Sequence, residues 1–369
     1  MCSQDGGVPL LEQTLKGNTS DSVHFREVLK SLEAKEGGKP EYYVVDAAMY
    51  GKETIEVLGD KTEWLSRVPI SIKEAQELVA KIEKEALEDI GNGYLAKEFP
   101  STYGGIEHRW FLIFSEEAYE REVKALEKRI GKIDKKLRKE LKQLKRVEFS
   151  CEADAKKALE RIEKKLKYHR IADSEIVEKK RYEKRGKATE NTKFEIVFHI
   201  FATLEKNELE IEAAKNRKGK FILATNIKEK DDKKFSIADY LRHYKQQQKV
   251  ERGFRFLKSN EFLADSVFLK KQSRIIALSM VMCLCLMVYT LAERKLRKEI
   301  ELQGKTLPNQ VGKEVKNPTM RWIFQLFEGI SVLYKQAEEK IISMVLNIKD
   351  IHIRILQLLG EDIAKFYET

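Results

Sequence analysis

A long run of charged residues in the middle of the chain carries a regular apolar seam. Between Glu116 and Glu148, 33 residues include 12 basic and 8 acidic side chains. The apolar positions alternate at spacings of three and four, with Glu140 in one slot: Val123, Leu126, Ile130, Ile133, Leu137, Leu144 and Val147. This spacing is typical of an amphipathic helix that packs by one narrow face. With a second amphipathic stretch at 155–166, it predicts a helical hairpin over about 116–167 whose charged faces lie in solvent.

The composition describes a charged chain with enough apolar material for a core. Charged residues form 35% of the 369 residues, against roughly 25% in an average soluble chain. Lys and Arg total 70 and Asp and Glu total 60, a net charge of +10. These values exclude a collagen, a small disulfide scaffold and a disordered acidic chain, and they are compatible with a polyanionic partner. The four cysteines do not form a secreted disulfide framework, which favours a reducing, cytoplasmic compartment.

One apolar run requires a choice between a buried helix and a membrane span. The 18 residues from Ile275 to Ala292 carry no charge, and that length reaches the lower limit for a transmembrane helix. The run contains Ser279, Tyr289 and Thr290, and the flanking charges show no asymmetry. We therefore expect a central buried helix, with Cys283 and Cys285 as core residues, and no membrane partner.

The remaining periodicity predicts a mixed α/β fold. Short apolar runs bounded by turn signals are expected to form strands: 8–15, 42–45, 64–68, 194–200 and 220–225. Capping residues and 3.6-residue periodicity predict helices: about 19–34, 236–258 and 275–292, and two more beyond Pro308 and Pro318.

The expected helix at 236–258 carries a row of polar side chains along one edge. On a helical wheel, Tyr244 and Lys258 lie within about 20° of Glu251, and Gln247 and Arg255 lie about 40° away. A carboxylate flanked by cations beside an apolar face suits a metal ion and a phosphate backbone. The same pattern also fits an ordinary amphipathic helix with a solvated Glu251–Arg255 pair.

Asp46 is a second candidate site residue. It comes directly after the apolar run Tyr42–Val45, and the carboxyl edge of a sheet is where α/β proteins gather their active-site residues. An aspartate at that position can equally cap a turn or a short helix.

These segments resemble the bacterial insertion-sequence transposases of the DDE class, in the group typified by insertion sequence four. The run YKQQQKVERGFRFLK matches the group's pattern of Tyr, two residues, Arg, three residues, Glu, six residues and Lys through Tyr244, Glu251 and Lys258, with Gln247 in place of the Arg. The segment YYVVDAAMY, which contains Asp46, resembles the second catalytic aspartate motif. Further segments resemble the group in the same order along the chain: DGGVPLLEQTLKGNTSD, WLSRVP, FILATN, FLADSVFLK and RWIFQLFEGI.

The resemblance implies an RNase H-like catalytic core that cleaves phosphodiester bonds and transfers DNA strands at the ends of a mobile element. In that chemistry, two metal ions about 3.5–4 Å apart activate the attacking oxygen and stabilise the leaving one. Asp46 and Glu251 would be catalytic ligands of Mg²⁺. Tyr244, Gln247, Arg255 and Lys258 would bind DNA phosphates. The implied partners are DNA and a second copy of the chain in a paired-end complex, in the bacterial cytoplasm near the nucleoid.

The resemblance also implies an order of domains. We expect residues 1–69 to form the first part of the core and residues 70–215 to form an insertion that contains the helical hairpin. Residues 216–260 are expected to complete the core and carry the glutamate helix, and residues 261–369 to form a helical C-terminal region.

The sequence further predicts that the chain is truncated and does not transpose alone. The family's first aspartate lies on a strand upstream of the turn at Asp5-Gly6-Gly7, and no residue here takes that place. Two alternatives stay open. One is a non-catalytic DNA-binding or scaffold protein derived from such an element, and the other is a membrane-associated helical protein built on the 275–292 run.

Overall fold

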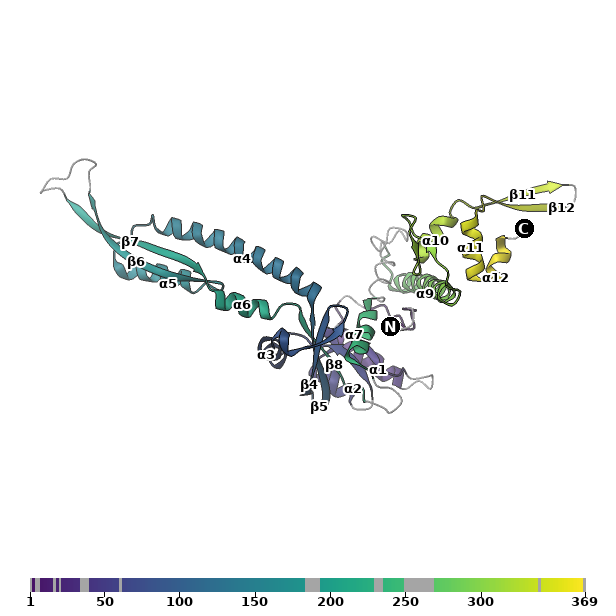
Figure 1. Ribbon diagram of the computed structural model, residues 1–369, viewed down its shortest axis with the longest axis horizontal. Helices are drawn as coiled ribbons and strands as arrows, with labels where there is room; N and C mark the ends of the chain where they lie inside the picture. The colour runs from purple at the N-terminus through teal and green to yellow at the C-terminus, as the bar shows by residue number, and fades with distance from the viewer. Residues whose placement is uncertain are drawn as a thin grey trace. The chain divides into compact units, whose positions relative to one another are not determined.

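A computed structural model describes residues 2–3, 7–15, 18–19, 21–33, 40–59, 62–182, 193–228, 235–248, 269–337 and 340–367 (Figure 1). The chain divides into two compact units, Phe25–Tyr240 and Met1–His24 together with Leu241–Thr369. Each unit contains both helices and strands, so the expected mixed α/β class is confirmed.

The unit Phe25–Tyr240 is built on a six-stranded sheet of order β1-β2-β8-β5-β4-β3. Its strands are β1 (Tyr43–Val45), β2 (Trp64–Arg67), β3 (Glu88–Gly91), β4 (Tyr94–Tyr103), β5 (Ile106–Ser115) and β8 (Lys220–Thr225). β1 and β2 are parallel, and every other neighbouring pair is antiparallel. The alternation along β5 divides its apolar residues between the two faces of the sheet, because successive side chains of a strand point to opposite sides.

Helices cover both faces of this sheet. One face packs against α1 (Asp21–Glu33), α2 (Lys52–Leu58) and α3 (Lys73–Lys81), around a core that includes Trp64, Trp110 and Leu112. On the other face, Phe111 stacks on Tyr240 of α7 (Ile237–Gln246), with ring centroids 5.1 Å apart. The expected helix near 19–34 and the strands at β1, β2 and β8 are confirmed.

The segment 116–219 leaves the sheet from β5 and returns to it at β8, with Ser115 N–H donating to the carbonyl of Gly219 at 2.9 Å. It contains α4 (Glu116–Leu144), α5 (Glu152–Glu163), the antiparallel strands β6 (His169–Tyr182) and β7 (Phe194–Lys206), and α6 (Glu208–Asn216). Residues 88–115 belong to the sheet, although we expected them inside an insertion spanning 70–215. They join it because the strongly apolar β5 pairs with both β4 and β8.

α4 and α5 occupy the stretch where the charged seam predicted a helical hairpin. The long β-ribbon of β6 and β7 follows α5 in the chain and lies beside the two helices (Figure 1). The first half of the α4 seam packs against Tyr168 and Ile211 through Leu126 and Ile130. Its last turn joins α5 and the β6–β7 ribbon in a second small core around Ile200. The apolar side chains of the seam thus pack largely against residues that follow α5 in the chain.

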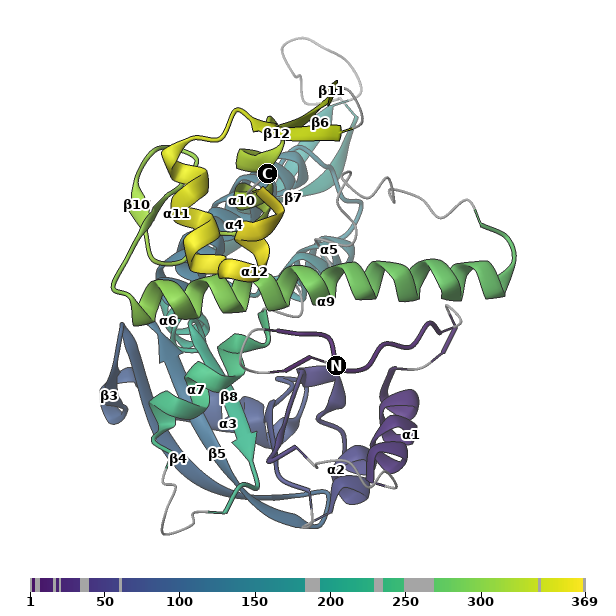
Figure 2. The same ribbon diagram turned by 90° about the vertical axis from the view of Figure 1, so that its right-hand side faces the viewer.

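The second unit contains the C-terminal helices, which share a core (Figure 2). They are α9 (Gln272–Leu302), α10 (Met320–Phe327), α11 (Asp350–Leu359) and α12 (Glu361–Ala364). This region also holds two small antiparallel sheets, formed by β9 (Leu307–Pro308) with β10 (Glu314–Val315) and by β11 (Ser331–Ala337) with β12 (Lys340–Leu346). The helix expected directly beyond Pro308 is therefore wrong. β11 pairs with β12 because β-branched and apolar residues dominate the two strands.

The expectation that the apolar run is a buried helix is also wrong for the described residues. α9 is long and apolar enough to cross a membrane by length and composition, and 6% of its apolar window is buried. The core of this unit contacts the C-terminal half of the helix, through Leu296 and Ile300, whereas Met280 and Val288 are exposed and Cys285 is exposed rather than in a core. A single helix of this kind is weak evidence for a membrane span.

The expected strand at 8–15 is wrong as well. Among the described residues, this stretch contains one isolated antiparallel bridge, Cys2 with Pro9. Ser3 N–H donates to the carbonyl of Val8 at 2.8 Å, so the chain does reverse direction around the predicted turn. Gln4, Asp5 and Gly6, which include most of that turn, lie outside the described residues.

Candidate functional site

Asp46 lies at the carboxyl end of β1, at the edge of the sheet where the parallel pair β1–β2 ends. Its side chain is exposed, and its Oδ1 accepts a hydrogen bond from Ala48 N–H at 3.0 Å, which caps a 3-10 helix at Ala47–Met49. The Ser66 hydroxyl on β2 donates to the Asp46 carbonyl at 3.1 Å. The interpretation of Asp46 as a cap is therefore confirmed, and its role as a metal ligand stays a prediction.

A buried polar network fixes the chain that follows Asp46. The Tyr50 hydroxyl lies 2.7 Å from Nε2 of His108 and accepts from Nε1 of Trp110 at 2.8 Å. His108 Nδ1 lies 2.8 Å from the Ile106 carbonyl, so Nδ1 carries the proton and Nε2 accepts from Tyr50. Burial raises the pKa of Tyr50 and lowers the pKa of His108, because the interior disfavours the charged form of each group. Both side chains therefore stay neutral and hold the Asp46 turn against the sheet.

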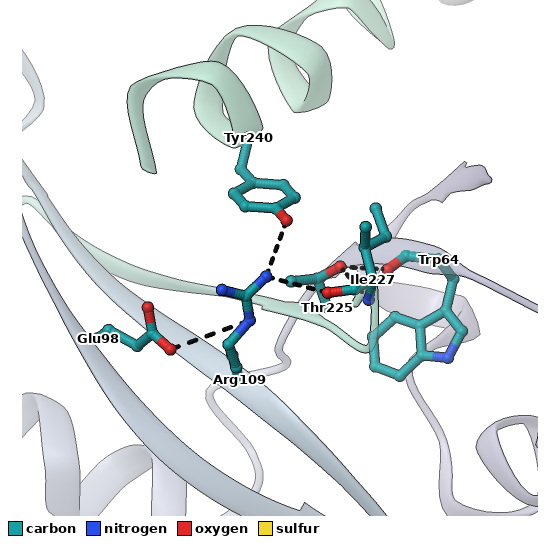
Figure 3. A network of polar contacts seen from close by, with 6 residues as sticks. All are labelled: Trp64, Glu98, Arg109, Thr225, Ile227 and Tyr240. Carbon is teal, nitrogen blue, oxygen red and sulfur yellow. Dashed lines mark hydrogen bonds and ion pairs between the residues drawn. The ribbon is translucent and has the colours of Figure 1, made fainter. Parts of the chain in front are cut away.

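A second network attaches α7 to the opposite face of the sheet (Figure 3). Arg109 on β5 donates to the Tyr240 hydroxyl at 2.8 Å and to the Ile227 carbonyl at 3.0 Å, and its guanidinium lies 3.9 Å from Glu98. The Thr225 hydroxyl donates to the Trp64 carbonyl at 2.6 Å, which fastens the end of β8 to β2. These contacts set the position of the first turn of α7.

The structure describes two residues of the polar row predicted along this helix, Tyr244 and Gln247. Tyr244 lies on α7, four residues after Tyr240 and so on the same side of the helix, and Gln247 follows at its end, with its N–H donating to the Tyr244 carbonyl at 3.1 Å. Glu251, Arg255 and Lys258 lie outside the described residues. Within the described part of the chain, this backbone hydrogen bond joins two of the predicted site residues, Tyr244 and Gln247.

The residues that the structure describes do not by themselves make a magnesium site. Magnesium prefers hard oxygen ligands and keeps several waters, so it needs a few converging carboxylates. Asp46 offers one exposed carboxylate, and no group of three or more His, Cys, Asp or Glu residues in the described part of the chain could hold a metal ion. The other predicted ligand, Glu251, is outside that part.

The comparison with protein families identifies the class of this fold and site. Residues 1–288 match the model of the transposase DDE domain. The match includes Asp46, the six-stranded sheet and α7, and it covers well over half of the chain. The chain therefore belongs to the family of DDE-domain transposases. Neither the curated proteins nor the solved structures include a significant match.

Sequence reasoning missed the residues that position Asp46 and α7. Tyr50 meets His108 across 58 residues of chain, and Arg109 meets Tyr240 across 131. No local spacing connects such pairs. The sequence carries one weak signal for them. A Tyr, a His and a Trp stand at 50, 108 and 110 within apolar runs, where the polar atom of a buried aromatic side chain needs a hydrogen-bond partner.

Proposed function

We propose that this chain is a DNA transposase of an insertion sequence, which cleaves and joins phosphodiester bonds at the ends of its element. The family match carries this proposal, because it includes an exposed aspartate at the carboxyl end of a core strand. The family implies DNA binding and generally uses a divalent metal. The group typified by insertion sequence four is the subgroup that the Tyr244, Glu251 and Lys258 pattern supports.

In this proposal each predicted residue has a distinct role. Asp46 and Glu251 contribute carboxylate oxygens to Mg²⁺, which when bound supplies a Lewis acid for the attack on phosphorus. Tyr244, Gln247, Arg255 and Lys258 hold the DNA end by its phosphates. Tyr50 and Ser66 act as positioning residues, because they fix the turn that carries Asp46. A second copy of the chain in a paired-end complex and a cytoplasmic location belong to the same proposal.

The alternative is a DNA-binding protein that retains the fold without the chemistry. One observation favours it: the Asp46 side chain already has a structural task as the cap of the helix Ala47–Met49. Under this alternative, the chain binds DNA and the aspartate serves the fold alone.

Strand cleavage of a labelled element end in Mg²⁺ tests the proposal. The parent is compared with Asp46→Asn and Glu251→Gln, which keep side-chain size and remove charge. Asp89→Asn is the matched control, because Asp89 also accepts from the backbone N–H two residues on, Gly91, at 2.8 Å. Cleavage that Asp46→Asn and Glu251→Gln abolish and Asp89→Asn preserves supports catalysis. DNA binding without cleavage by the parent supports the alternative.

A further inference from the structure

A basic pocket of about 580 Å³ lies at the end of the sheet where β8 begins. It forms between the end of β2, α3, the start of α4 and the turn that leads into β8. Its charged and polar lining residues are Arg67, Gln76, Glu77, Glu122, Arg217, Lys218 and Lys220. Four cations thus face two carboxylates.

Both carboxylates are close to cations of their own. Glu77 lies 3.8 Å from Lys73, which is outside the pocket, and Glu122 lies 3.8 Å from Lys218. Arg67 and Arg217 have no carboxylate partner among the described residues. Arg67 lies over the ring of Phe221 at 5.3 Å, which orients its guanidinium. Two guanidinium groups are therefore available for an anion, and the planar fork of Arg suits phosphate oxygens.

Lys220 adds a buried charge to the lining of the pocket. The residue is 8% exposed, and its ammonium donates to the Ile82 carbonyl at 2.5 Å and to Oδ1 of Asn216 at 2.6 Å. Both acceptors are neutral. Burial lowers the pKa of Lys220, although Glu83 and Glu85 act in the opposite direction. A buried ammonium without an ion-paired acceptor is stabilised by an anion that enters beside it.

The turn that carries Arg217 and Lys218 is held tightly against α4. Gly219 has a φ of +69°, and a Cβ at this position would lie 2.7 Å from Cβ of Tyr119 and 2.8 Å from the Ser115 carbonyl oxygen. Only glycine fits this backbone and this space. The cations on either side of Gly219 are therefore presented from a fixed turn.

The strand register places this pocket beside the Asp46 end of the sheet. Val45 of β1 pairs with Ser66 of β2 in parallel register. Asp46 and Arg67 each come one residue after this pair, at the same end of the sheet. Arg67 thus brings the pocket to the end of the sheet that also carries Asp46.

We propose that the pocket of Arg67, Arg217, Lys218 and Lys220 binds one phosphate group of a nucleic-acid backbone, at the end of the sheet that also carries Asp46. This inference rests on the proposed function in that it takes DNA as the source of the phosphate. Its chemistry, two guanidinium groups and two ammonium groups that line one cavity, suits a phosphate.

Salt-dependent binding of a labelled 30-base-pair duplex to the full chain tests the pocket without any cleavage. Each phosphate contact contributes about −0.9 to the slope of log K against log salt. Because both arginines hold the same phosphate, Arg67→Gln and Arg217→Gln should each reduce the slope by about 0.9, and the double variant by no more. Loss of such a contact corresponds to roughly a tenfold weaker affinity. Arg161→Gln, an exposed position on α5, is the control for removal of one charge. Equal changes in the control, or additive changes in the double variant, would overturn a single shared phosphate.

Arginine modification by phenylglyoxal, read by peptide mass spectrometry, identifies the ligand. Duplex DNA should slow the modification of Arg67 and Arg217 more than inorganic phosphate does at the same phosphate concentration. Protection by inorganic phosphate alone would assign the pocket to a free anion and overturn the nucleic-acid source. Protection by DNA in a protein that does not cleave would leave the pocket standing and remove only the catalytic proposal. Cleavage without protection of Arg67 and Arg217 would support the catalytic proposal and overturn the pocket.

Discussion

At the scale of single residues, the Asp46 end of the sheet depends on buried groups that must stay uncharged. His108 is buried and accepts a hydrogen bond from Tyr50 through Nε2. Protonation of His108 would convert that acceptor into a donor and place a charge in the core. The network is therefore stable only while the imidazole is neutral.

Acidification should destabilise the protein through His108. Burial lowers the pKa of His108 in the folded state, so below the unfolded value of about 6.5 the unfolded chain binds more protons. The free energy of unfolding should then fall as the pH drops from about 7 to about 5. Urea unfolding across that range, compared with His108→Gln, measures the effect. The variant should show a shallower pH dependence, and an unchanged slope would contradict a buried neutral histidine.

Gly219→Ala should be clearly destabilising. An added methyl group would lie within 3 Å of Tyr119 and Ser115, at a positive φ that L residues rarely adopt. The expected loss is about 1–3 kcal/mol. Gly131→Ala on α4 is the matched control, since nothing lies within 4 Å of its added Cβ and a helix interior gains up to about 1 kcal/mol from this change. Thermal unfolding of the two variants should shift in opposite directions.

At the scale of elements, the inserted segment 116–219 has small cores of its own. Ile200 is 1% exposed and packs with Ala155 and Leu159 in the core that joins α5 to the β6–β7 ribbon. The main sheet has a separate core around Trp64 and Trp110. Damage to the small core should therefore stay local.

Ile200→Ala tests whether the inserted segment unfolds separately from the sheet. Removal of a buried aliphatic side chain costs about 2–5 kcal/mol, and at Ile200 this loss falls on the small core. Amide hydrogen exchange should rise across α5, β6 and β7 and remain unchanged in β4, β5 and β8. Leu209→Ala serves as the control, because Leu209 is 85% exposed. Equal exchange increases in the sheet would show that the two regions unfold together.

The elements that could be predicted are those whose signal is local. β1, β2 and β8 are short apolar runs closed by turn residues, and α1 has a capping signal at its start. The β6 strand was missed because His169–Tyr182 carries charges on both sides and so resembles a solvated loop. The path of residues 88–115 into the main sheet depends on long-range pairing of β5 with β8, which no local pattern contains.

The candidate site shows the same division. Asp46 could be placed at a strand end because apolar residues precede it directly, and Tyr244 could be placed on a helix by its period. The supports of the site, Tyr50 with His108 and Arg109 with Tyr240, and the cations that β2 and β8 bring together arise from tertiary packing. Such contacts need the fold itself, because their partners are far apart in the chain.

At the scale of the whole molecule, the net charge of +10 predicts salt-dependent DNA binding. Neutralised phosphates release counterions, so log K should fall linearly with log salt by about 0.9 per phosphate. Anisotropy titrations of a duplex from low to high salt measure the slope, and Lys258→Ala should reduce it by roughly one. An affinity that does not change with salt would contradict a phosphate-binding role.

The hydrogen bond between Ser115 and Gly219 has a consequence for how this architecture can vary. Since β5 and β8 are adjacent antiparallel strands, everything between them is topologically a hairpin loop. The entropy of closing a loop grows only with the logarithm of its length, by about 0.6 kcal/mol for each doubling. Related chains could therefore enlarge, shrink or exchange this segment and acquire new surfaces, without disturbing the strand order or the sheet edge that carries Asp46.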